Sequence, residues 1–83
     1  MQHFVYILFS ESVNRFYVGA TQDVLQRLKR HNAGASKATK TGRPWKIVYT
    51  EEFSSKTDAL KREIQIKKKK SRKYIEWLVT SNK

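Results

Sequence analysis

Two short apolar segments near the start of the chain limit the fold more than any other feature. The first, residues 3–9 (HFVYILF), is too short for a free-standing helix and rich in aromatic and β-branched residues, which favours a strand. Four turn-like residues, 11–14 (ESVN), separate it from a second strand-like segment at residues 15–20 (RFYVGA). This pattern predicts a β-hairpin.

A helix and a loop are expected after the hairpin. Thr21 can cap a helix that ends near residues 32–34, where an asparagine and a glycine form a stop signal. The apolar side chains expected on one face of this helix are Val24, Leu25 and Leu28. Residues 33–44 contain two glycines, the only proline and several small polar residues, so a basic loop is expected there.

The second half of the chain predicts one more strand and two more helices. Residues 45–53 (WKIVYTEEF) are β-rich, and residues 54–58 (SSKTD) offer caps for a helix that the basic run 67–70 continues or ends. The side chains expected to face the core from this helix are Leu60, Ile64 and Ile66. Ser71 can cap a last helix. Its apolar residues at helical spacing are Tyr74, Ile75, Leu78 and Val79.

The order β-β-α-β-α-α predicts a single α+β domain over residues 1–83. Three strands without crossover helices between them favour a small antiparallel sheet, flanked by the three helices. The chain has no cysteine, which excludes disulfides and thiolate zinc sites and suits the reducing cytoplasm, where we expect the protein. Its first residues also lack the basic lead and cleavage site of a secretion signal.

Charge points to a nucleic-acid partner. The 83 residues include 18 Lys and Arg against 7 Asp and Glu, which gives a formal net charge of +11 and a pI near 10.2. Such a field attracts polyanions. The basic residues are spread over three segments and interleaved with aromatics, which is more typical of a nucleic-acid surface than of a membrane anchor. No apolar run approaches the roughly 20 residues needed to cross a bilayer.

Five residues of the hairpin and the first helix have side chains or backbones suited to chemistry, yet each alone has an ordinary structural explanation. Gly19 ends a strand, where glycine permits a bend or a close approach. Tyr6 and Tyr17 are typical of half-buried sheet residues. Arg27 and His31 are four residues apart and share one helical face, and a basic face exposed to solvent would explain this pair without any function.

A later carboxylate, Glu63, is spaced to pair with Lys67 on a helix surface. Taken together and in order, however, these residues resemble the GIY-YIG nuclease family, and in particular its small single-domain bacterial members. The motif residues are Val5-Tyr6-Ile7, Tyr17-Val18-Gly19, Arg27, His31 and Glu63. The chain departs from the family pattern at Val5, which replaces a glycine, and at Ala20, where many members carry a lysine. Family members also commonly carry an asparagine some residues after the acidic residue, which is Glu63 here. This chain has none at that spacing, and the nearest is Asn82.

The resemblance implies a metal-dependent endonuclease that hydrolyses DNA phosphodiester bonds, with Mg²⁺ or Mn²⁺ and no small-molecule cofactor. Arg27 would donate to a phosphate oxygen as charge grows there, with a fork geometry that lysine lacks. Glu63 would hold the metal, because Mg²⁺ needs few carboxylates and takes further oxygens from water and substrate phosphate. Tyr17 or Tyr6 would activate the attacking water, the other orienting it or binding phosphate. His31 would assist proton transfer or hold the phosphate, and all five side chains are expected to converge on one concave face.

Basic residues outside this set are expected to contact backbone phosphates, which gives affinity without sequence preference. They are Lys37, Lys40, Arg43, Lys67, Lys68, Lys69, Lys70, Arg72 and Lys73. Nothing in the sequence resembles a base-reading module, so target choice is expected to follow nucleic-acid structure or backbone. Two alternatives stay open. One is a catalytically inactive nucleic-acid-binding module on the same fold, which the departures at Ala20 and after Glu63 favour. The other is a small RNA-associated basic protein, against which the tyrosine–arginine–glutamate set argues.

Overall fold

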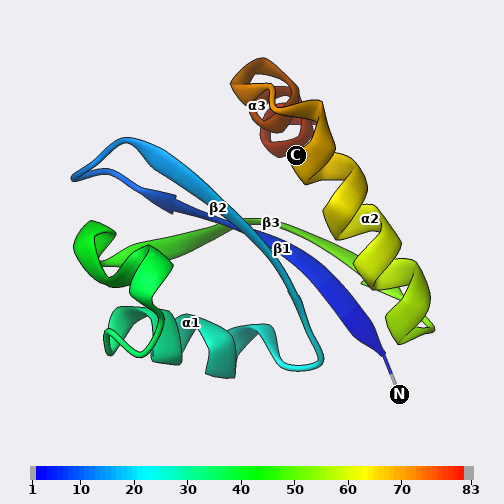
Figure 1. Ribbon diagram of the computed structural model, residues 1–83, viewed down its shortest axis with the longest axis horizontal. Helices are drawn as coiled ribbons and strands as arrows, with labels where there is room; N and C mark the ends of the chain where they lie inside the picture. Colours follow the sequence, from blue (N-terminus) through cyan, green and yellow to red (C-terminus); the bar gives the residue numbers. More distant parts are fainter. Residues whose placement is uncertain (1, 82–83) are drawn as a thin grey trace.

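Three antiparallel strands form the centre of the molecule (Figure 1). The computed structural model describes residues 2–81, and its strands are β1 (His3–Ser10), β2 (Arg15–Thr21) and β3 (Trp45–Phe53). Their order across the sheet is β2-β1-β3, with β1 paired antiparallel to both neighbours. The predicted hairpin and third strand are therefore confirmed, and each strand boundary lies within one residue of its expected position.

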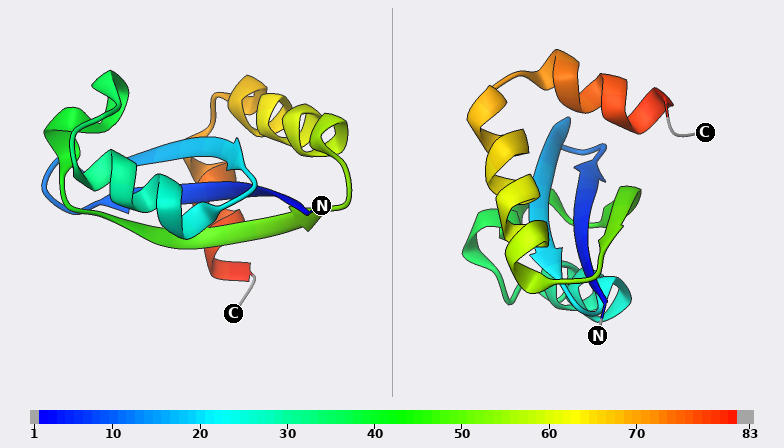
Figure 2. Two further views of the ribbon diagram at one scale, coloured as in Figure 1. Left: turned by 90° about the horizontal axis from the view of Figure 1, so that it is seen from below. Right: turned by 90° about the vertical axis from the view of Figure 1, so that its right-hand side faces the viewer.

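Three α-helices surround this sheet: α1 (Val24–Asn32), α2 (Lys56–Lys69) and α3 (Arg72–Ser81). Figure 2 shows α1 and α3 on opposite faces of the sheet, while α2 runs beside β2, on the side away from β1. The α+β class and the order β-β-α-β-α-α are confirmed.

The central strand β1 is buried on both faces, which explains its uninterrupted apolar run. Val5 and Ile7 point into a core shared with α2 and α3, whereas Tyr6 and Leu8 point into a second core on the α1 side. All four side chains are at most 1% exposed. Successive side chains of a strand face opposite sides, so a strand covered on both sides shows no polar alternation.

The first helix differs from its prediction in two details. Thr21 is the last residue of β2, and the cap of α1 is Asp23, whose carboxylate accepts a hydrogen bond from the Gln26 backbone N–H at 3.0 Å. Leu25 was expected to face the core but is 68% exposed. The inward line of α1 instead runs through Val24, Leu28 and the buried His31. A histidine thus occupies the third inward position of this helix.

The prediction of which residues of α2 face the core is also partly wrong. Leu60 and Ile64 are 40% and 54% exposed, while Ala59 and Ile66 are almost fully buried. Helical spacing places Glu63 between these two buried residues, and its side chain is only 17% exposed. The expected cap is present, since Ser55 accepts from the Asp58 backbone N–H.

The ends of α2 and α3 follow the sequence prediction. The helix α2 ends at Lys69, and Lys70 has a left-handed backbone with φ +47°. Ser71 caps α3 by accepting a hydrogen bond from the Tyr74 backbone N–H at 3.2 Å. The expected apolar residues of α3 pack against the core, with Leu78 buried and the other three partly buried: Tyr74, Ile75 and Val79.

The segment predicted as a plain loop contains a short 3₁₀ helix, η1 (Lys37–Gly42). Its stability comes from tertiary contacts, which sequence patterns do not reveal. Thr39 is fully buried, and the Trp45 indole donates a hydrogen bond to its carbonyl oxygen at 2.7 Å. Gly42 is required at its position because a Cβ there would lie 2.4 Å from the Trp45 ring.

Candidate active site

A hydrogen-bonded chain starts at Tyr6 in the centre of the sheet. The Tyr6 hydroxyl lies 3.0 Å from His31 Nε2, and His31 Nδ1 lies 2.7 Å from the Thr39 hydroxyl oxygen. The Thr39 hydroxyl donates in turn to the Ser36 carbonyl. Neutral imidazole has one donor and one acceptor. The chain is therefore satisfied when Tyr6 donates to Nε2 and Nδ1–H donates to Thr39.

Tyr17 joins Tyr6 and His31 in a cluster of three rings. Tyr6 pairs with Gly19 across the hairpin, and a side chain at Gly19 would lie 2.5 Å from the Tyr6 hydroxyl. Glycine is therefore needed here for close approach of the ring. Tyr17, two residues before Gly19, points to the same face. Its ring centroid lies 4.8 Å from that of His31 and 6.4 Å from that of Tyr6.

Arg27 and Tyr17 face a hollow of about 230 Å³ next to this cluster. Arg27 lies one turn before His31 on α1, so both side chains border the hollow from the same helix. The complete lining is Tyr17, Arg27, Arg30, His31, Ala35 and Ser36. Tyr6 lies beneath the hollow rather than in its wall, because its side chain is 1% exposed.

Glu63 belongs to α2. Its carboxylate forms an ion pair with Lys67, whose Nζ donates a hydrogen bond to it at 2.6 Å. The charge of Glu63 also acts on Tyr6, whose pKa it helps to raise. Thus Tyr17, Arg27 and His31 border one hollow, whereas Glu63 is not part of its lining and is connected to the cluster only through its charge effect on Tyr6.

Burial keeps both members of the Tyr6–His31 pair neutral. It raises the pKa of Tyr6 to about 12, with Tyr17 and Glu63 adding to the rise and Arg27 opposing it. Burial likewise lowers the pKa of His31, and the positive charges of Arg27 and Arg30 lower it further. At neutral pH the pair therefore consists of a protonated phenol and an uncharged imidazole.

The lowered pKa of His31 predicts that acid weakens the fold. Its native pKa lies below the unfolded value of 6.5, so the unfolded chain binds the extra proton more readily. This contribution to stability is complete above pH 6.5 and is lost as the pH falls through the native pKa. We expect the free energy of unfolding in urea to drop more steeply from pH 7.5 to pH 5 in the wild type than in His31→Gln. Equal slopes would contradict this prediction.

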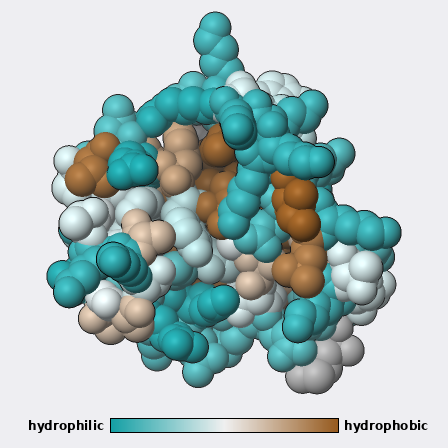
Figure 3. All heavy atoms as spheres, viewed as in Figure 1, coloured by the Kyte–Doolittle hydropathy of each residue, from teal (hydrophilic) through white to brown (hydrophobic). Residues whose placement is uncertain are grey.

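The predicted phosphate-binding residues are all exposed and form two groups. One group is on or beside η1, next to the end of α1: Lys37, Lys40 and Arg43. The other surrounds the junction of α2 and α3: Lys67, Lys68, Lys69, Lys70, Arg72 and Lys73. Figure 3 shows hydrophilic side chains over most of one face of the molecule, with hydrophobic patches set between them.

Donors for a metal ion are few. In residues 2–81 there is no group of three or more His, Cys, Asp or Glu side chains that could hold one. Glu63 is the carboxylate whose charge acts on the ring cluster, through Tyr6. One carboxylate fits Mg²⁺ when water and substrate phosphate supply the remaining oxygens, and does not fit a permanently bound structural metal.

Sequence patterns missed Thr39 and Asn32. Thr39 fixes the orientation of His31, as described above. The Asn32 amide bonds both backbone groups of Trp45, at 3.1 Å to its carbonyl and 2.6 Å from its N–H. The sequence pattern assigns Asn32 only to the stop signal of the helix. No periodic signal marks either residue, because both act across a turn.

The ring cluster, the hairpin and the helix order define a known class of protein. The model of the GIY-YIG catalytic domain matches residues 2–75, and the chain belongs to this family. More narrowly, it is 48% identical over 67 residues to a UPF0213 protein of Staphylococcus haemolyticus, covering 80% of each chain. It is 46% identical over 68 residues to a UPF0213 protein of Listeria monocytogenes, covering 81% of this chain and 74% of that protein.

A solved structure agrees with this placement. The solution NMR structure of a UPF0213 protein from Bacillus halodurans is 37% identical in sequence and superposes with a TM-score of 0.61. The match covers 99% of this chain and 86% of the other. The family resemblance predicted from the sequence is therefore confirmed. Within residues 2–81, none of the helices has the length and apolar character needed to span a membrane.

Proposed function

We propose that the protein is a metal-dependent endonuclease that hydrolyses DNA phosphodiester bonds and selects its target by structure or backbone rather than by sequence. One observation carries this proposal. Tyr17 and Arg27 border one hollow beside the Tyr6–His31 pair, in a chain of the GIY-YIG catalytic domain family. A hollow that combines a phenol with a guanidinium suits a phosphate and an attacking water.

The two tyrosines take different roles in this proposal. Tyr6 is buried, its pKa is raised to about 12, and its hydroxyl is committed to His31, so it stays protonated and holds the cluster together. Tyr17 is only partly buried and borders the hollow, so its hydroxyl is the one that can activate water. His31 is 3% exposed and therefore serves as a positioning residue for Tyr6.

Arg27 and Glu63 supply the charges. The Arg27 guanidinium donates to a phosphate oxygen as its negative charge grows during attack. Glu63 would hold Mg²⁺ or Mn²⁺, which neutralises charge on the phosphate when bound. Its present partner, Lys67, is half-exposed, and such pairs are worth about 0.3–0.5 kcal/mol. Exchange of this partner for a divalent cation therefore costs little.

A binding module without catalysis is the second candidate. Two observations favour it: Ala20 packs against the core where many family members have a lysine, and Lys67 already neutralises Glu63. The asparagine nearest to the missing family position, Asn82, lies outside the described residues. Such a module would bind nucleic acid through the same basic surface and leave it intact.

Cleavage assays separate these two functions. The protein is incubated with branched, flapped and plain duplex DNA, once with Mg²⁺ and once with EDTA. The endonuclease proposal predicts nicks only with Mg²⁺. Tight binding without nicks on any DNA or RNA substrate would favour the silent module instead.

Salt dependence tests the proposed phosphate contacts. If about five phosphates are contacted, the logarithm of the affinity for duplex DNA falls with a slope of about −4 to −5 against log salt. Changing Lys68 and Lys69 to alanine and Lys70 to glycine should flatten this slope and preserve the fold. Glycine suits position 70 because its φ is +47°. An unchanged slope would place the DNA footprint elsewhere on the surface.

A further inference from the structure

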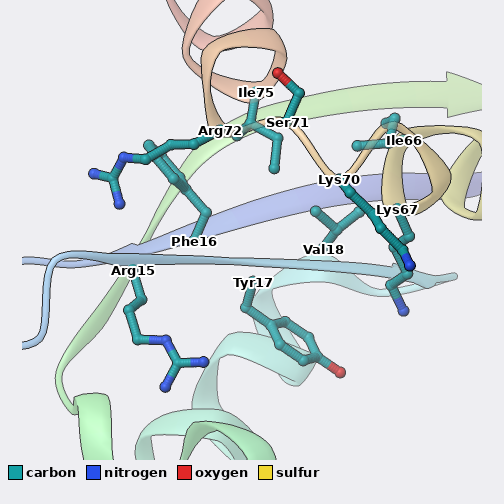
Figure 4. A pocket seen from close by; sticks show the side chains of 10 residues that line it. All are labelled: Arg15, Phe16, Tyr17, Val18, Ile66, Lys67, Lys70, Ser71, Arg72 and Ile75. Carbon is teal, nitrogen blue, oxygen red and sulfur yellow. The ribbon is translucent and has the colours of Figure 1, made fainter.

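A second hollow, of about 420 Å³, lies between β2, α2 and α3 (Figure 4). Its walls combine apolar side chains with four cations. The apolar residues are Phe16, Val18, Ile66 and Ile75, and the cations are Arg15, Lys67, Lys70 and Arg72. Its volume falls within the range of small-molecule sites in proteins. An apolar interior ringed by positive charge matches a ligand with an apolar body and anionic groups beside it.

The cation Arg72 is held in place before any ligand binds. Its guanidinium donates to the Asn14 backbone carbonyl and side-chain oxygen, each at 2.7 Å, and to Glu76 at 3.0 Å. The guanidinium carbon also lies 5.0 Å from the centre of the Phe16 ring. Because Glu76 already pairs with Arg72, Arg72 orders the wall of the hollow beside Phe16 and adds little net positive charge to it.

Two of the other cations extend to the edge strand β2. Figure 4 shows Phe16 and Val18 pointing to one face of β2 and Tyr17 to the other, with the amines of Lys67 and Lys70 reaching down to the level of β2 and beyond it. Because β2 is an edge strand, a ligand can extend around it from one face to the other.

Tyr17 connects this hollow with the candidate active site, because Tyr17 is a lining residue of both. A nucleic-acid strand that placed a phosphate between Tyr17 and Arg27 would therefore continue towards the second hollow, because Tyr17 lines both. There the amines of Lys67 and Lys70 would be available to its phosphates, and the apolar walls to a base.

We propose that this hollow binds an unpaired nucleobase of the strand whose phosphate occupies the candidate active site. The inference rests on the proposed function, because that function places the strand. Nucleobases present apolar faces, and each is attached to anionic phosphates, which matches the apolar walls and cationic rim. A base within an intact duplex is stacked and paired, so only a bulge, flap, branch or single strand can deliver one cheaply.

Binding without cleavage tests this proposal. A duplex with one unpaired 2-aminopurine is compared with a fully paired duplex of the same sequence, in EDTA and at one salt concentration. The wild type should bind the bulged duplex about tenfold more tightly, which corresponds to about 1.4 kcal/mol. The 2-aminopurine emission should change on binding to the bulged duplex and stay level with the paired one.

Two variants and a control assign the preference to the hollow. Ile75→Phe fills the apolar space, and Lys70→Gly removes a rim cation at a position where φ is already positive. Both should remove most of the preference for the bulge, with thermal melting confirming that each variant is folded. Lys68→Ala also removes one positive charge, but from a residue outside the hollow, and should weaken binding to both duplexes equally.

Equal affinity of the wild type for both duplexes would overturn the proposal, as would a preference that survives in both variants. Displacement of the bulged duplex by phosphatidylserine vesicles, with loss of vesicle binding in Ile75→Phe, would assign the hollow to lipid and overturn it too. Cleavage is scored separately. Mg²⁺-dependent nicking without bulge preference would leave only the endonuclease proposal standing, and bulge preference without nicking would leave only this one.

Discussion

Replacing Glu63 with glutamine should reduce Mg²⁺-dependent nicking by orders of magnitude and leave the fold intact. The amide keeps the shape of the carboxylate but loses the negative charge that a divalent cation requires. The lost pair with Lys67 is of the i,i+4 type and costs about 0.3–0.5 kcal/mol. DNA affinity should stay level or rise, because a group that repels phosphate has been removed. Nicking, thermal melting and DNA binding are measured on one preparation.

Glu11→Gln is the matched control for this change. Glu11 also pairs with a lysine, Lys46, at 2.9 Å, and its replacement alters the net charge by the same amount. Unlike Glu63, Glu11 is not among the charges that shift the pKa of Tyr6, so the nicking rate of Glu11→Gln should match that of the wild type. Undiminished cleavage by Glu63→Gln would rule out the metal role of Glu63. A loss in both variants would show that net charge, and not the carboxylate at position 63, controls the rate.

The central strand could be predicted from the sequence because a strand buried on both faces is an uninterrupted apolar run. The buried faces of the helices were harder to predict. Periodicity identifies which residues share a face, but it does not show which side of a helix its neighbours cover. On α1 the third inward position belongs to His31, and Leu25 is left in solvent. On α2 the line that faces the sheet and α3 is Ala59–Ile66, so Leu60 and Ile64 are exposed.

The candidate site was predictable where its residues follow a spaced motif. Tyr6, Tyr17 and Gly19 are fixed by strand register, and Arg27 is fixed by its spacing to His31 on the helix. The buried environment of the tyrosine–histidine pair was not predictable. It depends on Thr39 in η1, and that segment is ordered by contacts with α1 and Trp45 rather than by its own propensity. The difference between the two tyrosines is therefore visible only in three dimensions.

That difference predicts opposite outcomes for two phenylalanine variants. Tyr17→Phe removes the hydroxyl that borders the hollow, so nicking should fall by about 10²–10⁴-fold, the usual contribution of a general base. Its stability should change little, because the Tyr17 ring remains beside His31. Tyr6→Phe removes the buried donor to His31 Nε2, and an unsatisfied buried acceptor costs about 1–3 kcal/mol. The main effect of Tyr6→Phe should therefore be a lower free energy of unfolding, measured in urea.

Activity and stability must be measured on both variants to read this comparison. At a temperature where both are fully folded, Tyr6→Phe should retain more nicking activity than Tyr17→Phe, because it changes the support of the site and leaves the Tyr17 hydroxyl in place. The reverse pattern would exchange the two roles and make the buried tyrosine the base despite its pKa of about 12.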